Sequence, residues 1–176
     1  MTKAPRTELA LVLAALALTA LAACKGRPAE ADKVRPTPSG LPVPRFVSLK
    51  FGEVNARAGP GDDSRLLWTY RSRGLPLLVI AETKEWRRVC DPTGVKSWVK
   101  STGVDGRRTV LRLESTRLPL LQAPDPAARV QAFLEGRAIA ALDRCKDGWC
   151  RVKTPDASGW TTASSLWGTD ERQQCR

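Results

Sequence analysis

The chain carries two series of short apolar segments, each of strand length and each separated from the next by turn residues. In the first series, residues 54–58 alternate apolar and polar side chains, and Gly-Pro-Gly follows at residues 59–61. A period of two is typical of a half-buried strand, and the glycines and proline favour a turn. Further strand-like segments follow at residues 75–81, 86–90 and 95–100. The pattern predicts a small antiparallel barrel.

The second series repeats the first in the same order. Trp149 lies 63 residues after Trp86, and Trp160 lies 62 residues after Trp98. This common spacing indicates a duplicated unit. We therefore predict an all-β fold of two tandem small barrels. Residues 62–73 interrupt the first unit as a long excursion, in which we expect Asp62 and Asp63 to stabilise a turn.

The N-terminal segment has the features of an export signal. Lys3 and Arg6 precede an apolar run at residues 9–23, which is too short to span a membrane. The run ends in Leu-Ala-Ala-Cys, which resembles the bacterial lipobox and implies a lipid on Cys24. Ordinary cleavage after Ala22 is the alternative, and it would leave Cys24 as a free thiol. Lys25 follows the cysteine, and by resemblance to enterobacterial sorting it implies anchoring at the outer membrane.

Residues 24–44 contain five prolines and no hydrophobic period, as expected for a tether. Extended proline-rich chain of this length reaches roughly 60 Å. The sequence thus predicts the following organisation: a signal peptide at residues 1–23, the tether at 24–44, barrel one at 45–108, barrel two at 109–168 and a C-terminal tail at 169–176.

Two motifs resemble a known family. Asn55-Ala56-Arg57-Ala58-Gly59-Pro60, followed by strands that carry Trp86 and Trp98, resembles the opening of bacterial SH3-like domains. The end of the second unit, Ser165-Leu166-Trp167-Gly168, is similar to exported tandem SH3-like proteins. The resemblance covers residues 45–168 and implies noncovalent binding, with peptidoglycan or cell-wall peptide as the expected target.

Aromatic and basic residues supply the candidate binding site. Trp68 and Tyr70, in the excursion, are the aromatic candidates, because flat rings can grip an extended peptide with little loss of entropy. Trp86 and Trp98, flanked by apolar residues, are expected to be core or half-buried. Arg57, Arg87 and Arg88 are the basic candidates, although Arg57 also suits a hydrogen bond to turn carbonyls. The basic side chains could equally form a solvated surface.

Composition limits the chemistry. The formal net charge is +11, which suits an anionic target or simply keeps the protein soluble. Histidine is absent, and this excludes Ser-His-Asp and Cys-His hydrolases and every zinc site that contains histidine. We expect no enzymatic activity, no cofactor and no metal, and export disfavours a nucleic-acid partner.

Four cysteines remain after Cys24. Cys145 and Cys150 flank Lys146-Asp147-Gly148-Trp149, and Asp-Gly is a strong two-residue hairpin signal. That register places the two cysteines opposite one another at disulfide distance. Cys90 and Cys175 form a possible second pair that would hold the tail on barrel one. Reduced thiols, or a zinc site of four cysteines, are the alternatives.

The sequence therefore predicts a non-catalytic lipoprotein in the periplasm, anchored at the outer membrane, that binds peptidoglycan. A protein-protein adaptor in an envelope complex, or a structural spacer, is the alternative function.

Overall fold

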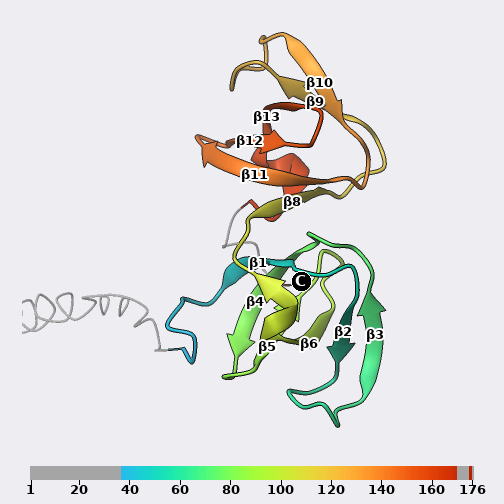
Figure 1. Cartoon of the computed structure of the whole chain (residues 1–176). Helices are drawn as coiled ribbons and strands as arrows, with labels where there is room; N and C mark the ends of the chain where they lie inside the picture. Colours follow the sequence, from blue (N-terminus) through green and yellow to red (C-terminus); the bar gives the residue numbers. More distant parts are fainter. Residues whose placement is uncertain (1–36, 170–174, 176) are drawn as a thin grey trace, which may run out of the picture. The chain divides into compact units, whose positions relative to one another are not determined.

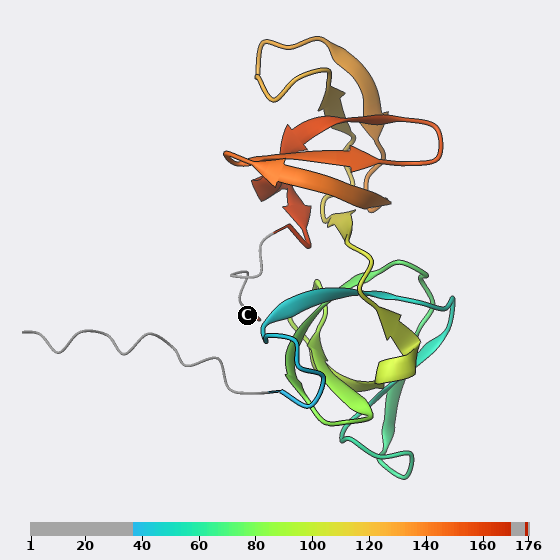
Figure 2. The same cartoon turned by 60° about the vertical axis from the view of Figure 1, so that its left-hand side comes forward.

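A computed structural model describes residues 37–169 and 175 of the chain (Figure 1). The signal peptide, Cys24 and most of the predicted tether lie outside the described residues. The described chain forms two seven-stranded antiparallel sheets, each curved around its own apolar core (Figures 1 and 2). This all-β arrangement of two tandem barrels confirms the predicted fold class. No helix among the described residues is both long and apolar enough to cross a membrane.

Barrel one has strand order β3-β2-β6-β5-β4-β1-β7. Its elements are β1 (Arg45–Leu49), β2 (Val54–Arg57), β3 (Leu66–Tyr70), β4 (Pro76–Glu82), β5 (Trp86–Cys90), β6 (Lys96–Lys100), the short 3₁₀ helix η1 (Ser101–Gly103) and β7 (Val104–Asp105). The excursion expected at residues 62–73 therefore contains a strand. That strand, β3, pairs with β2 through Val54 opposite Tyr70 and Ala56 opposite Trp68.

Barrel two repeats this topology as β10-β9-β13-β12-β11-β8-β14. Its elements are β8 (Thr109–Arg112), β9 (Leu118–Leu121), β10 (Val130–Leu134), β11 (Ile139–Lys146), β12 (Trp149–Lys153), β13 (Ser158–Thr162), the 3₁₀ helix η2 (Ala163–Ser165) and β14 (Leu166–Trp167). Every strand holds the same position as its counterpart in barrel one, which is what duplication of one unit produces.

Alternating side chains build each core. In barrel one the fully buried residues include Leu49, Leu77 and Val99, and in barrel two they include Val110 and Val152. Burying an aliphatic side chain of this size contributes about 1.5–3 kcal/mol relative to leaving it exposed. Because a barrel of about 60 residues buries only about 60% of the surface that its unfolded chain exposes, each unit alone is only marginally stable. Contacts beyond each core therefore matter for this chain.

The hairpin between β11 and β12 has the predicted register. Asp147 and Gly148 have positive φ angles of 50° and 80°, as a two-residue hairpin turn requires. Lys146 pairs with Trp149, and Cys145 pairs with Cys150. The two cysteines form a disulfide with their Cα atoms 4.0 Å apart. Closing so short a loop is worth about 2 kcal/mol in the chain-entropy model.

A third apolar cluster joins the two barrels. It contains Phe46, Leu78 and Cys90 of barrel one and Leu111 and Trp167 of barrel two. The Phe46 and Trp167 rings meet edge to face with centroids 5.3 Å apart, and the indole Nε1 of Trp167 donates a 3.0 Å hydrogen bond to the Pro76 carbonyl. The last strand of barrel two is thus packed and hydrogen-bonded against barrel one.

Polar and covalent links extend this junction. The Thr109 hydroxyl donates to the Gly74 carbonyl at 2.6 Å and also lies 2.6 Å from the Ser48 hydroxyl. Cys90 and Cys175 form a disulfide, with Cα atoms 5.7 Å apart and a sequence separation of 85. The chain end is therefore bonded to β5 of barrel one.

Glu82, at the end of β4, holds three segments together. Its carboxylate accepts hydrogen bonds from the Ser39 amide at 2.9 Å and the Ser39 hydroxyl at 2.5 Å, and it forms ion pairs with Arg45 at 2.5 Å and Arg87 at 3.2 Å. Only 1% of the Glu82 side chain is exposed. Residues 37–44 belong to the predicted tether, and these bonds hold Ser39 of that segment on barrel one.

Candidate functional site

Three side chains form a line across the outward face of barrel one. Register places Arg57 of β2 opposite Trp98 of β6, and Trp98 opposite Arg88 of β5. Their neighbours Ala56, Val89 and Val99 point into the core and are fully buried. Since side chains alternate along a strand, the three residues point outward together. We call Arg57, Trp98 and Arg88 the Arg–Trp row.

A second pair lies beside this row. Register places Trp86 opposite Lys100, and the Lys100 ammonium lies 5.7 Å from the centre of the Trp86 ring. The same ammonium is 2.6 Å from the Asp62 carboxylate. A hollow of about 230 Å³ is lined by Val54, Asn55, Arg57, Asp62, Trp86 and Lys100. Trp86 itself is buried, with 5% of its surface exposed, so the outward face of barrel one combines the half-buried ring of Trp98, several cations and a shallow recess whose wall includes Trp86.

Arg57 also shapes the loop that borders the recess. Its Nη1 donates a 2.7 Å hydrogen bond to the Ser64 carbonyl, which fixes the loop between β2 and β3. In the same loop, a Cβ added to Gly59 would lie 2.8 Å from the Ser64 hydroxyl oxygen. A larger residue would collide with Ser64 there, so the glycine allows the two sides of this loop to approach closely.

The structure separates the five candidate residues onto two sides of the sheet. Arg57 and the exposed Arg88 share the outward face. Trp68 and Tyr70 pair with inward-pointing residues of β2, and their rings contact each other edge to face at 5.8 Å. Tyr70 is buried, and burial raises the pKa of its hydroxyl to about 12. These two rings build the core of barrel one.

Arg87 lies in a structural ion pair. It donates to the Thr83 carbonyl at 2.8 Å and contacts Glu82 at 3.2 Å, and 13% of its side chain is exposed. Trp98, which we expected to be core or half-buried, is half-buried but faces outward beside Arg88. The sequence could have predicted this outward position, because Trp98 alternates with Lys96 and Lys100 along the strand. Alternate side chains of a strand share one face, and lysine favours the solvent side.

Barrel two keeps part of the row. Register places Trp160 between Arg151 and Leu121. The Arg144 guanidinium lies 5.3 Å from the centre of the Trp160 ring, and a cation over an aromatic face is attracted by the ring quadrupole. The Arg–Trp pair is thus repeated, while buried Leu121 replaces Arg57.

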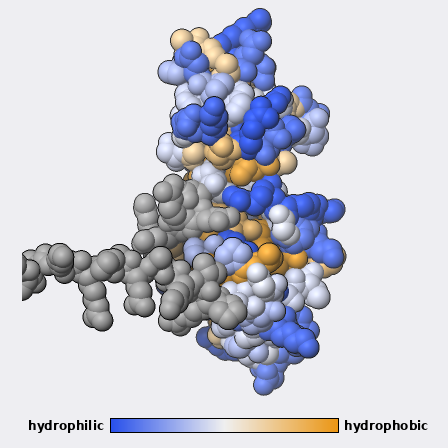
Figure 3. Space-filling model, turned by 90° about the vertical axis from the view of Figure 1, so that its left-hand side faces the viewer, coloured by the Kyte–Doolittle hydropathy of each residue, from blue (hydrophilic) through white to orange (hydrophobic). Residues whose placement is uncertain are grey.

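One face of the molecule is largely polar. On the face drawn in Figure 3, hydrophilic residues dominate and hydrophobic residues form limited patches. Among the described residues, no group of three or more His, Cys, Asp or Glu side chains could hold a metal ion. Such a surface suits noncovalent contacts with a charged or polar ligand.

Two small barrels with outward aromatic and basic side chains define a protein built from tandem SH3-like modules. The chain belongs to the bacterial SH3 domain family, since the family's sequence profile matches residues 50–106 and 114–168. Domains of this family are binding modules.

Similar solved structures are distant. NlpC1 from Trichomonas vaginalis is 12% identical with a TM-score of 0.33, and the match covers 70% of this chain and 45% of that protein. NlpC2 from Trichomonas vaginalis is 12% identical with a TM-score of 0.32, over 70% of this chain and 48% of that protein. The chain thus spans about half the length of these proteins. No curated protein matches the chain.

Proposed function

We propose that this protein is a non-catalytic envelope binding protein that holds peptidoglycan through the outward face of barrel one. The observation that carries the proposal is the Arg–Trp row, in which Trp98 lies between two arginines beside the Trp86–Lys100 pair. An aromatic face contacts peptide backbone, and the arginines meet the carboxylates of wall peptides. Repetition of the Arg–Trp pair in barrel two supports the same use of both barrels.

Co-sedimentation with purified sacculi tests this proposal. Trp98→Ala and Arg88→Ala are each expected to weaken retention about fivefold to tenfold, because each removes a direct contact with the wall. Retention by the unchanged protein should also fall with salt, which screens exposed charges beyond about 8–10 Å. Lys84→Ala is the matched control, since it removes an exposed charge from the β4–β5 turn. Equal retention of all four proteins would contradict the proposal.

A protein-protein adaptor is the second candidate function. It is favoured if the folded protein fails to sediment with sacculi at low salt. A circular dichroism spectrum that matches the sheet-rich fold would show that the failure is not due to unfolding.

We also propose the location of this activity. Cleavage before Cys24 and lipidation of that residue would anchor the protein at the outer membrane, and residues 24–44 would connect the anchor to the barrels. The intact mass of the exported protein is expected to exceed that of the cleaved chain by the mass of the lipid, and the protein is expected to partition into detergent. Cys24→Ser should abolish both properties. An unmodified, detergent-excluded protein would disprove the anchor.

A further inference from the structure

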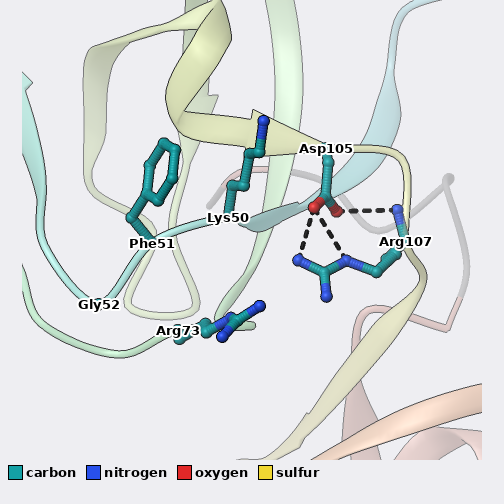
Figure 4. Close-up of a pocket in the computed structure, with 6 residues that line it drawn as sticks. All are labelled: Lys50, Phe51, Gly52, Arg73, Asp105 and Arg107. Atoms are coloured by element: carbon teal, nitrogen blue, oxygen red, sulfur yellow. Dashed lines mark hydrogen bonds and ion pairs between the residues drawn. The ribbon is translucent and has the colours of Figure 1, made fainter.

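A second hollow, of about 520 Å³, lies on barrel one and is lined by Lys50, Phe51, Gly52, Arg73, Asp105 and Arg107 (Figure 4). None of these residues belongs to the Arg–Trp row or its recess. They come from three separate segments: the β1–β2 turn, the β3–β4 turn and the chain from β7 onward. Three cations therefore meet at one place, with one carboxylate among them.

Asp105 positions Arg107 instead of cancelling the charge of the hollow. Its carboxylate accepts hydrogen bonds from the Arg107 amide at 3.1 Å and from Nε at 2.8 Å, and it lies 2.6 Å from Nη2. The hydrogen bond from the Arg107 side chain lowers the pKa of Asp105, so the carboxylate remains charged at neutral pH. Arg107 is thus held in one orientation, as Figure 4 shows.

The other two cations have no such partner. Within the part of the chain that the structure describes, neither Lys50 nor Arg73 lies within 4 Å of a carboxylate oxygen, although the charge of Lys50 helps to lower the pKa of Asp105. The Lys50 ammonium lies 5.3 Å from the centre of the Phe51 ring. Phe51 itself is 50% exposed, so its ring is open to solvent at the edge of the hollow. An aromatic ring and two cations without a carboxylate partner therefore border the same open space.

Barrel two shows that this charge is not a requirement of the fold. The Leu49 amide donates to the Leu75 carbonyl in barrel one, and the Arg112 amide donates to the Ala138 carbonyl in barrel two. The same hydrogen bond thus identifies equivalent positions in the two barrels. Lys50 and Phe51 then correspond to Leu113 and Glu114, and Arg73 corresponds to Gly136. The same corner of barrel two thus lacks these two cations, and its Glu114 is paired with Arg112 at 2.5 Å.

We propose that the hollow binds the anionic group of a sugar phosphate or a carboxylated sugar. Guanidinium groups recognise phosphate and carboxylate through hydrogen bonds from their N–H groups. Asp105 occupies Nε and Nη2 of Arg107 and leaves Nη1 to donate to a ligand, while Arg73 can supply a paired contact. The exposed Phe51 ring offers an apolar surface to the sugar ring beside the anion. This site is separate from the Arg–Trp row, so it can be tested without reference to wall binding.

Titration of the purified ¹⁵N-labelled protein with glucose 6-phosphate, followed by NMR, tests the site. Shift changes are expected at the amides of residues 50–52, 73 and 105–107, with millimolar affinity, and glucose alone should cause none. Arg73→Ala is expected to weaken binding about tenfold. Arg71→Ala is the matched control. Arg71 lies two residues before Arg73, carries the same charge and forms an exposed ion pair with Glu53, so its removal should leave binding unchanged.

Phe51→Ala tests the contact with the sugar ring independently of the contact with the anionic group. It should weaken binding of glucose 6-phosphate severalfold while leaving binding of inorganic phosphate unchanged. Equal effects of Arg71→Ala and Arg73→Ala would show nonspecific charge attraction and overturn the proposal. Binding to phosphatidylglycerol vesicles without any response to glucose 6-phosphate would also overturn it, because the anion would then come from a lipid surface.

Discussion

Replacing Trp167 with alanine is expected to lower the free energy of unfolding by about 3–5 kcal/mol. The indole is buried in the cluster that joins the barrels, where its ring meets Phe46 and its Nε1 donates to the Pro76 carbonyl. Alanine would leave a cavity in that cluster and would remove the hydrogen bond to Pro76. We expect urea denaturation to show this loss and to separate unfolding into two transitions, because each barrel would lose its principal contact with the other.

Phe133→Ala is the control for this experiment. Phe133 is also aromatic, but it lies on the edge strand β10 and is 52% exposed. Its removal is expected to change stability by less than about 0.5 kcal/mol. If Trp167→Ala were as stable as Phe133→Ala, the contact between the barrels would contribute little to folding.

Glu82→Gln is expected to destabilise the protein by about 3 kcal/mol at neutral pH. Glutamine fills the same space but cannot neutralise Arg45 and Arg87, whose side chains are 10% and 13% exposed. Removing one partner of a buried ion pair leaves the other charges uncompensated. Residues 37–44 should also detach, since Ser39 bonds to this carboxylate.

The effect of Glu82→Gln should depend on pH. Burial alone would raise the pKa of Glu82, but hydrogen bonds from Ser39 and Arg45 outweigh burial and lower the pKa from 4.5 to about 2. A carboxyl with a lowered pKa stabilises the folded state fully above its unfolded pKa, and that stabilisation is lost as the pH falls towards the folded value. The stability difference between the two proteins should therefore shrink between about pH 5 and pH 2.

Thermal unfolding of both proteins across this pH range measures the difference. Glu135→Gln provides the comparison, because Glu135 pairs with Arg117 at 2.9 Å while both side chains are largely exposed, at 62% and 67%. An exposed pair is worth less than about 1 kcal/mol. A difference for Glu82→Gln that stays constant down to pH 2 would contradict the assignment of the lowered pKa.

Local patterns predicted the architecture. The alternation at residues 54–58 and the spacing of Trp86 and Trp149 depend only on near neighbours and on repetition, and the structure confirms two tandem barrels. The Asp147-Gly148 turn predicted the register of its hairpin, because turn type alone fixes which residues face each other.

Long-range pairing could not be predicted in the same way. Trp68 and Tyr70 looked available for a ligand because residues 62–73 gave no sign of pairing with β2, and the partner strand is what turns both rings inward. The contact of Trp167 with Pro76 joins residues 91 positions apart, and no local pattern encodes it. The role of Glu82 could not be predicted either, since its partners come from three separate segments of the chain.

The row of β1, β4 and β5 that receives Trp167 in barrel one is not repeated in barrel two. In barrel one the row is Phe46, Leu78 and Cys90, and register places Thr109, Ala141 and Lys153 at the same positions in barrel two. A head-to-tail contact propagates into an open array only when every unit presents the surface that its neighbour requires. At these positions barrel two has a threonine whose hydroxyl is already bonded to barrel one, an alanine and a lysine, so it lacks the apolar side chains and the thiol of barrel one. The duplication thus copied the fold without copying this row, so the Trp167 contact runs in one direction, from barrel two onto barrel one.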